Sequence, residues 1–307
     1  IETVEAEAEA GKVTGLILMS GKEMGFIVGA DISEFDQLDT EAKVIDGIKP
    51  VNAMLDRLER LPVPVVAAIH GVCVGGGFEL ILACHYRIAT RDGSTRVGFP
   101  EVKLGILPGA GGTQRSPRIM GVEKAIDFMI SGDPVSTEKA KELGLVDEIV
   151  RGDLRAAAIT YANRLLRDGQ GVRRGSQLTA TVDGAPEAFF AGVRERTAKA
   201  WRGYPAPLAI VACVEAAVTQ PFAKGVVFER QQFEKLVKSD ESRALRHLFF
   251  AEREAARIPD VPADTAVTEI KAAAVIGAGT MGGGIAMNFV NAGIPVKLLE
   301  MKQEAMD

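Results

Sequence analysis

The sequence predicts an α/β fold, in which helices pack against the faces of a sheet, and three observations lead to this class. Short apolar runs bounded by turn residues are typical of buried strands. Segments with helical spacing of their apolar residues lie between these runs, and that alternation places helices on a sheet. From residue 186 to residue 258 the pattern is almost entirely helical, which indicates a helical extension.

Strands and helices alternate in the first half of the chain. The predicted strands are VTGLILMSG (13–21), PVVAAIHG (64–71), YRIAT (86–90) and a short run before Pro100. The predicted helices are 50–61, 78–84, 122–130 and 137–143. In the first of these helices, apolar residues recur three and four positions apart, which places them on one face.

The second half of the chain is predicted to be helical. An amphipathic helix starts near residue 154, and residues 168–185 are polar and glycine-rich, as expected of a loop. The helices that follow are punctuated by Pro205, Pro207 and Pro221, because proline ends or begins a helix. We predict a linker at 258–265 and a new strand from Lys271.

The composition excludes several classes of protein. Of the 307 residues, 47% are hydrophobic and 25% are charged, enough to bury a sizeable core. The net charge of −5 argues against nucleic-acid binding, which needs a basic surface. Residues 272–296 carry no charge, but their many glycines, together with Asn288 and Asn291, argue against a membrane span.

Cysteines and histidines indicate neither a disulfide framework nor a metal site. They lack the spacing of either feature; they are Cys73, Cys84, Cys213, His70, His85 and His247. We therefore predict no metal and a reducing compartment, the cytoplasm. The chain begins at Ile1 in an acidic stretch that is neither a signal peptide nor a transit peptide, so we expect further residues upstream.

Three glycine-rich turns suggest a site for chemistry in the first 115 residues. They are GADI (29–32), GGGFEL (75–80) and PGAGGTQR (108–115). The second turn opens a helix, whose first N–H groups lack partners and can hold a developing oxyanion. Glu79 lies in the first turn of that helix, where it is either a catalytic group or a favourable charge at the helix dipole.

Glu101 is the second candidate carboxylate, in VGFPEVKLGILPGAGG directly after Pro100. It is either a solvated loop charge or the partner of Glu79. Two carboxyls of different proton affinity that face one substrate can act as general acid and general base. The sequence leaves open whether the two side chains meet.

These turns, in this order, resemble the enoyl-CoA hydratase (crotonase) superfamily. The resemblance covers about residues 1–165 and includes SGKEMGFIVGADISEF, VPVVAAIHGVCVGGGFELILACHYRIAT and VSTEKAKELGLVDEIV. It implies a crotonase-like spiral of repeated ββα units, whose first strands this chain lacks. It also implies an acyl-CoA thioester substrate, hydration of trans-2-enoyl-CoA, and a possible Δ3-Δ2-enoyl-CoA isomerisation.

The resemblance also assigns roles to four residues. The main-chain N–H groups of Ala30 and Gly76 would form an oxyanion hole for the thioester carbonyl. Glu79 would help to activate a water for attack at C3, and Glu101 would exchange a proton at C2. Because many superfamily members lack one of the glutamates, the presence of both favours hydration.

A second constellation lies near the C-terminus, in KAAAVIGAGTMGGGIAMNFVNAGIPVKLLE. It fits a strand, a G-x-G-x-x-G turn (Gly277, Gly279, Gly282), a helix and a strand ending at Glu300, the first β-α-β of a Rossmann-type domain. The turn would bind a pyrophosphate and Glu300 a ribose 2′-OH, which favours NAD over NADP. A glycine-rich helical hairpin is the alternative.

The order of these segments resembles multifunctional β-oxidation enzymes that pair a hydratase with an L-3-hydroxyacyl-CoA dehydrogenase. We expect a hydratase core at 1–185, a helical extension and linker at 186–265, and an incomplete dehydrogenase domain at 266–307. Relatives of this kind include complexes with a thiolase, which is a possible partner. A crotonase-fold isomerase or hydrolase and a non-catalytic acyl-CoA-binding module remain as alternatives.

Overall fold

The chain forms two compact units in a computed structural model that describes residues 1–23, 25–262 and 264–303. The first unit is Ile1–Arg253 and the second is Glu254–Asp307. The predicted limits at 185 and 265 differ from this division. The helices after residue 185 bury Phe190, Ile210 and Phe233 in the same core as the preceding strands, so they form one unit with them.

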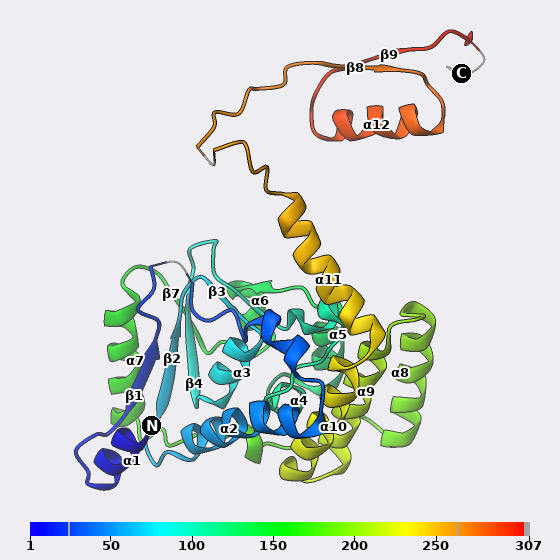
Figure 1. Cartoon of the computed structure of the whole chain (residues 1–307). Helices are drawn as coiled ribbons and strands as arrows, with labels where there is room; N and C mark the ends of the chain where they lie inside the picture. Colours follow the sequence, from blue (N-terminus) through cyan, green and yellow to red (C-terminus); the bar gives the residue numbers. More distant parts are fainter. Residues whose placement is uncertain (24, 263, 304–307) are drawn as a thin grey trace. The chain divides into compact units, whose positions relative to one another are not determined.

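Two sheets organise the first unit (Figure 1). The larger sheet is parallel and has the strand order β1-β2-β4-β7, with β1 Leu16–Met19, β2 Val65–Ile69, β4 Tyr86–Thr90 and β7 Glu148–Val150. The smaller sheet has the order β3-β5-β6, with β3 Val72–Val74, β5 Arg96–Gly98 and β6 Val135–Ser136. Both faces of β2 are buried, as its uninterrupted apolar run predicts.

A ββα unit occurs twice in this unit, and the repeat determines where the glycine turns lie. Strands β2 and β4 enter the larger sheet, and β3 and β5, which follow them, enter the smaller one. Helix α3 (Gly76–Ala83) follows β3 and helix α4 (Gly112–Met120) follows β5. Because β3 and β5 are parallel neighbours, with Val74 paired to Gly98, the turns after both strands lie at the same edge.

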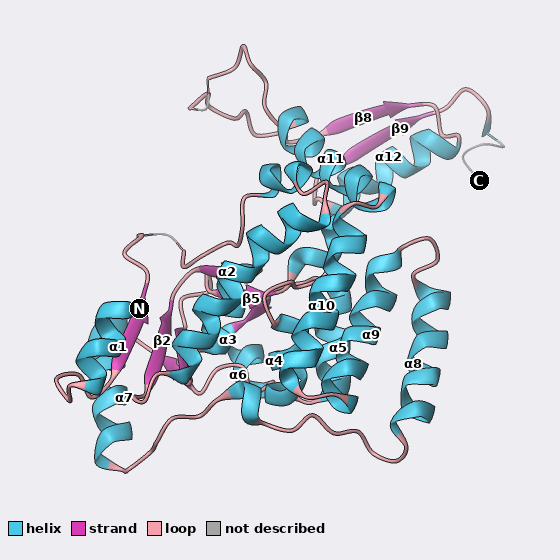
Figure 2. Cartoon of the chain, turned by 60° about the horizontal axis from the view of Figure 1, so that its bottom comes forward, coloured by secondary structure: helices cyan, strands magenta, loops and turns pink. Residues whose placement is uncertain are grey.

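Helices surround the sheets (Figure 2). The other helices are α1 Glu2–Glu9, α2 Glu41–Arg60, α5 Val122–Ser131, α6 Thr137–Glu142, α7 Leu154–Arg167, α8 Pro186–Ala200, α9 Pro205–Thr219, α10 Phe222–Val237 and α11 Asp240–Ala255. Short 3-10 helices span Ile32–Gln37, Pro100–Leu104 and Gly175–Gln177. Helix α7 packs on β1, β2 and β4, whereas α9 and α10 pack on α4. These two helices thereby cover the side of the core that carries the glycine turns.

The second unit is a β-α-β element, as the fingerprint predicts. Parallel strands β8 (Ala273–Ile276) and β9 (Val296–Leu299) are joined through α12 (Thr280–Asn291). The predicted third segment, 266–307, ends in residues 304–307, which lie outside the described residues.

The sequence patterns place most elements within a few residues, but the helix predicted at 50–61 begins at Glu41, ahead of the apolar spacing that predicted it. Two kinds of element were missed. Strands β3, β6 and β7 have only two or three residues each, too few for a periodic pattern. Helix α4 begins with glycine and contains Pro117, both of which disfavour a helix in sequence-based reasoning.

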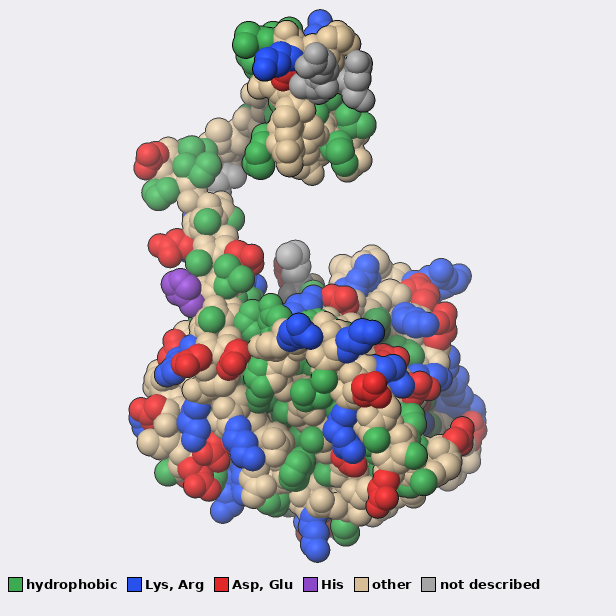
Figure 3. Space-filling model, turned by 90° about the vertical axis from the view of Figure 1, so that its right-hand side faces the viewer, with side chains coloured by type: hydrophobic (Ala, Val, Ile, Leu, Met, Phe, Trp, Pro, Cys, Tyr) green, Lys and Arg blue, Asp and Glu red, His purple; other side chains and the backbone are tan. Residues whose placement is uncertain are grey.

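Basic and acidic side chains are interspersed over the face of the first unit in Figure 3. Among the residues that the structure describes, no helix is long and apolar enough to cross a membrane. All three cysteines are buried and reduced.

The core under the glycine turns can be tested through Ile81 of α3, which has no exposed surface. Replacing Ile81 by alanine removes buried methyl groups and leaves a cavity, so we expect the free energy of unfolding to fall by about 2–5 kcal/mol. Chemical denaturation measures this change. Ile159→Ala on α7, where the side chain is 46% exposed, is the control and should change stability by less than about 1 kcal/mol. Equal effects would contradict the placement of the core.

Candidate active site

A cavity of about 170 Å³ lies at the edge where the glycine turns meet. It is lined by Ala30, Gly76, Glu79 and Glu101, the four residues to which the family resemblance assigns catalytic roles. One water needs only about 10–15 Å³ by the same measure. The cavity therefore has room for a small organic group together with a water.

Two main-chain N–H groups are available at this cavity. Residues 26–29 run beside β3, since Phe26 N–H donates to Val72 and Val74 N–H donates to Ile27, at 3.0 Å each. This pairing brings Gly29 against Gly76, where a β-carbon on Gly29 would lie 3.4 Å from the Gly76 nitrogen. Among the described residues, the N–H groups of Ala30 and Gly76 have no hydrogen-bond acceptor.

The turn before α3 depends on glycine. Gly75 has φ 59° and ψ −133°, a combination that residues with a β-carbon avoid. Its N–H donates to Gly98 of β5 at 3.0 Å, which holds the turn to the neighbouring strand. As a result the first N–H groups of α3 point out of the helix end, where the helix dipole favours negative charge.

Glu79 is buried at this helix end and held from one side. Its Oε1 accepts the N–H groups of Ala110 at 2.6 Å and Gly112 at 2.8 Å. Burial raises the pKa of Glu79 to about 7, although these two donors and Arg115 favour the ionised form. A carboxyl with this pKa can accept and return a proton near neutral pH.

Glu101 follows β5 in a 3-10 helix and is also buried. Its Oε2 has no exposed surface and no hydrogen-bond partner within the described residues. A β-carbon on Gly75 would lie 3.4 Å from Glu101 Oε1, so this carboxyl faces the turn before α3. Burial raises the pKa of Glu101 well above its usual value, and the charges of Glu79 and Glu229 raise it further.

Glu229 of α10 is a third buried carboxyl that the sequence analysis did not select. It accepts the N–H groups of Gly111 at 2.7 Å and Thr113 at 3.0 Å, and the hydroxyl of Thr113. Burial raises the pKa of Glu229 to about 8, and the charge of Glu79 acts in the same direction. The sequence does contain a sign of this role: Glu229 lies between Gly225 and Phe233, at four-residue spacing on an otherwise apolar helix face.

The side chain of Arg115 is buried near Glu79 and acts on its charge. The Arg115 side chain is fully buried in an ion pair with Glu59, with a distance of 2.9 Å between Nη2 and Oε2. The charge of Arg115 favours the ionised form of Glu79. A buried cation is stable here because it is paired.

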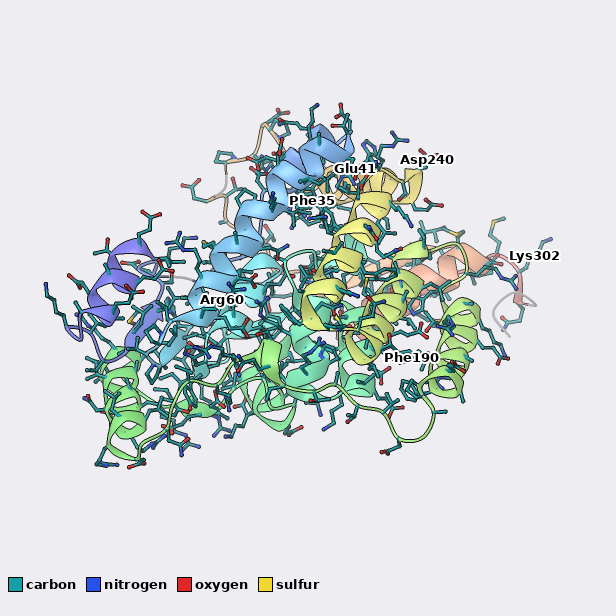
Figure 4. All side chains as sticks on the ribbon, turned by 90° about the horizontal axis from the view of Figure 1, so that it is seen from below. Phe35, Glu41, Arg60, Phe190, Asp240 and Lys302 are labelled. Carbon is teal, nitrogen blue, oxygen red and sulfur yellow. The ribbon has the colours of Figure 1, made fainter. Side chains whose placement is uncertain are left out.

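The remaining walls of the cavity are apolar. They include Ile32, Phe35, Ile48, Leu107 and Phe233. Phe35, labelled in Figure 4, packs edge-to-face on Phe233 of α10 with 6.1 Å between the ring centres. A hydrocarbon chain is the kind of ligand that such walls accept.

The glycine turn of the second unit brings together the four residues that the sequence analysis assigned to dinucleotide binding. A β-carbon on Gly282 would lie 1.8 Å from the Gly277 carbonyl oxygen, and Gly277 has φ 99°, so both positions require glycine. Gly279 lies in open space at the start of α12. Glu300 Oε2 accepts the Ala278 N–H at 2.7 Å, which places the acid beside the turn.

Within the described residues, no group of three or more histidine, cysteine or acidic side chains could hold a metal ion.

Comparison with known proteins gives two family matches. Residues 2–183 match the family described as enoyl-CoA hydratase/isomerase. Residues 272–307 match the NAD binding domain of 3-hydroxyacyl-CoA dehydrogenase.

Single proteins and solved structures are also similar to this chain. A fatty acid oxidation complex subunit alpha from Shewanella baltica is 39% identical over 302 residues, which is 96% of this chain and 42% of the relative. The chain thus spans less than half the length of the curated relatives that it matches. An enoyl-CoA hydratase structure from Bacillus anthracis has a TM-score of 0.50 and 28% identity, covering 82% of this chain and 83% of that one.

A further structure bears on the fold alone. An enoyl-CoA hydratase from Bacillus halodurans has a TM-score of 0.55 and 21% identity, over 80% of this chain and 88% of that one. Together with the repeated ββα units, this similarity confirms the expected crotonase-like fold.

The raised pKa of Glu101 predicts how stability depends on pH. Between the ordinary pKa of 4.5 and its raised value in the fold, folded Glu101 keeps a proton that the unfolded chain has lost. Stability must therefore fall as pH rises through this range. Glu101→Gln removes the ionisation, so we expect it to raise the free energy of unfolding more at pH 8 than at pH 5.

Urea unfolding at the two pH values measures this difference. Glu195→Gln is the control, because Glu195 is exposed on α8 and should give no pH-dependent gain. An equal change for Glu101→Gln at both pH values would show that Glu101 ionises normally in the fold.

Proposed function

Because the chain belongs to the enoyl-CoA hydratase/isomerase family, we propose that its first unit adds water reversibly to trans-2-enoyl-CoA and forms L-3-hydroxyacyl-CoA. The single observation that carries the proposal is the meeting of Glu79, Glu101 and two free main-chain donors in one apolar cavity. Neither donors nor acids alone would supply this chemistry.

The main-chain donors account for activation of the thioester. The N–H groups of Ala30 and Gly76 would both bind its carbonyl oxygen. When a hydroxyl adds to C3, the electron pair of the C2=C3 bond moves toward that oxygen and forms an enolate. Preorganised donors in a desolvated site stabilise such a charge more than water does.

The two glutamates account for the proton transfers. Glu79, whose charge raises the pKa of Glu101, would take a proton from the attacking water through Oε2, because Oε1 already accepts two N–H groups. Glu101, which keeps its proton more strongly, would deliver that proton to C2 of the enolate. Transfer of a proton from Glu79 to Glu101 then restores the pair, and one water has been added.

Isomerisation of a 3-enoyl-CoA to the 2-enoyl form is a second activity of the same site. Glu101 Oε2 is buried and has no hydrogen-bond partner among the described residues, so once deprotonated it could remove a proton from C2 and return it to C4. The oxyanion donors would stabilise the same enolate. Chromatographic product analysis with 3-enoyl-CoA distinguishes this activity from hydration.

We extend the proposal to the whole protein, in which the second unit would belong to an NAD-dependent 3-hydroxyacyl-CoA dehydrogenase. The turn at Gly277, Gly279 and Gly282 would hold the pyrophosphate of NAD at the start of α12. Glu300 would bind a ribose hydroxyl beside it. When bound, NAD would accept the hydride from the 3-hydroxyacyl product.

The relatives' name, fatty acid oxidation complex subunit alpha, supports a role in β-oxidation and assembly with another subunit. A thiolase, which would consume the 3-ketoacyl product, is the partner that we propose. The three buried thiols are consistent with a reducing compartment such as the cytoplasm.

The glutamate pair gives the main test of hydration. Glu79→Gln and Glu101→Gln each remove one proton-transfer group but preserve its shape, so we expect hydration of a 2-enoyl-CoA to fall by about 10²-fold or more. The loss of absorbance of the conjugated thioester measures the rate.

Glu195→Gln serves again as the control and should keep the wild-type rate. Wild-type turnover in both active-site variants would refute the hydratase assignment. Binding of the thioester without turnover by the wild-type chain would instead favour an acyl-CoA-binding module.

A further inference from the structure

The turn at residues 110–113 is held by two carboxylates from opposite sides. Glu79 of α3 accepts the N–H groups of Ala110 and Gly112, and Glu229 of α10 accepts those of Gly111 and Thr113. Successive N–H groups thus point alternately to the two acids. The position of Glu79 Oε1 therefore depends on a turn whose other half is fixed by Glu229.

One face of helix α10 packs against the turn and the residues beside it. Gly225 packs against Gln114, since a β-carbon there would lie 2.0 Å from Gln114 Oε1. One helical turn later comes Glu229, and Phe233 follows one turn after that. A β-carbon on Gly109 would lie 2.8 Å from the Phe233 ring, so the helix face covers the segment from 114 back to 109.

From these contacts, and on the basis of the proposed hydration, we propose that Glu229 is a positioning residue of the reaction. It fixes the turn at 110–113 so that Glu79 is held by Oε1, which leaves Oε2 for the substrate. Glu229 does not line the cavity, so it acts through these neighbours.

The same hydrogen bonds would also be made by a residue that only stabilises the turn. The surroundings of Glu229 argue against so limited a role. The residue has no exposed surface, and burying an acid is costly where an apolar side chain could pack. The groups that face it are Glu79 of α3, Glu101 after β5, Thr113 of α4 and Cys213 of α9. When ionised, Glu229 raises the pKa of Glu101, and the charge of Glu79 raises the pKa of Glu229, so the three carboxyls are electrostatically linked.

The substitution Glu229→Gln tests the proposal. The amide oxygen can keep the Gly111 N–H, but the amide NH₂ meets the Thr113 N–H without an acceptor, so the turn shifts. A small misplacement of a catalytic group is costly, and we expect kcat for hydration to fall between about tenfold and a hundredfold. KM should change by less than about twofold, because the donors at Ala30 and Gly76 are untouched.

The pH profile separates positioning from a merely structural role. The pKa of Glu229 is about 8, so above that pH Glu229 is ionised and its charge raises the pKa of Glu101. Glu229→Gln removes this charge and makes the proton of Glu101 easier to lose at alkaline pH. The alkaline limb of the kcat profile should therefore move to lower pH in Glu229→Gln. A loss of stability alone would lower the melting temperature and leave this limb in place.

The matched control is Glu234→Gln on the same helix, which breaks a surface ion pair with Lys238 and should leave both kcat and the profile unchanged. If Glu229→Gln does not fold, Thr113→Val removes one donor to Glu229 and should lower kcat in the same direction. Thr113→Ser keeps that hydroxyl and should restore the rate.

The outcomes distinguish this inference from the proposed function. If wild type hydrates enoyl-CoA, Glu79→Gln and Glu101→Gln do not, and Glu229→Gln behaves like Glu234→Gln, only the role of Glu229 is refuted. If Glu229→Gln does not fold and Thr113→Val matches wild type, the role is refuted as well. If wild type does not hydrate enoyl-CoA, both proposals fail.

Discussion

The structure of the site depends on burying three carboxyls around one glycine turn. A carboxylate removed from water is destabilised unless hydrogen bonds replace its hydration. Four consecutive main-chain N–H groups, from Ala110 to Thr113, provide that replacement for Glu79 and Glu229. Within the part of the chain that the structure describes, Glu101 Oε2 accepts no hydrogen bond. The two donors to Glu79 favour its ionised form, whereas burial and the charges of Glu79 and Glu229 raise the pKa of Glu101. Acid and base roles require such a separation of proton affinities.

The repeated ββα unit explains why the acids meet at all. Glu79 follows β3 and Glu101 follows β5, and the two strands are parallel neighbours in the smaller sheet. Carboxyl ends of adjacent parallel strands lie at one edge, so residues 22 positions apart come to face the same cavity. The same geometry brings the free N–H of Gly76 to this edge, at the start of the helix that carries Glu79. The pairing of β3 with β5 therefore creates both the smaller sheet and the site.

Features of the fold and the site that depend on short sequence patterns could be predicted, whereas those that depend on contacts between distant residues could not. The apolar run at 65–69 and the turn at Gly75 carry local patterns, so the strand, the helix start and the G-x-G-x-x-G turn were predictable. The roles of Ala30, Gly76, Glu79 and Glu101 came from family resemblance, because their approach depends on strand pairing. Glu229 was missed because its partners lie more than 110 residues earlier. The sequence indicated Glu229 only through an acidic residue among the apolar positions of one helix face.

The need for α10 follows from the same energetics. Without Glu229, the N–H groups of Gly111 and Thr113 would be buried and unpaired, at a cost of about 1–3 kcal/mol for each. A turn under that penalty would move toward water, and Glu79, which the alternate N–H groups hold, would move with it. The helix after residue 221 is therefore more than a cover for apolar surface. It completes the hydrogen bonding of a turn on the far side of the cavity wall, and the site needs sequence well beyond the segment that the glycine-rich turns define.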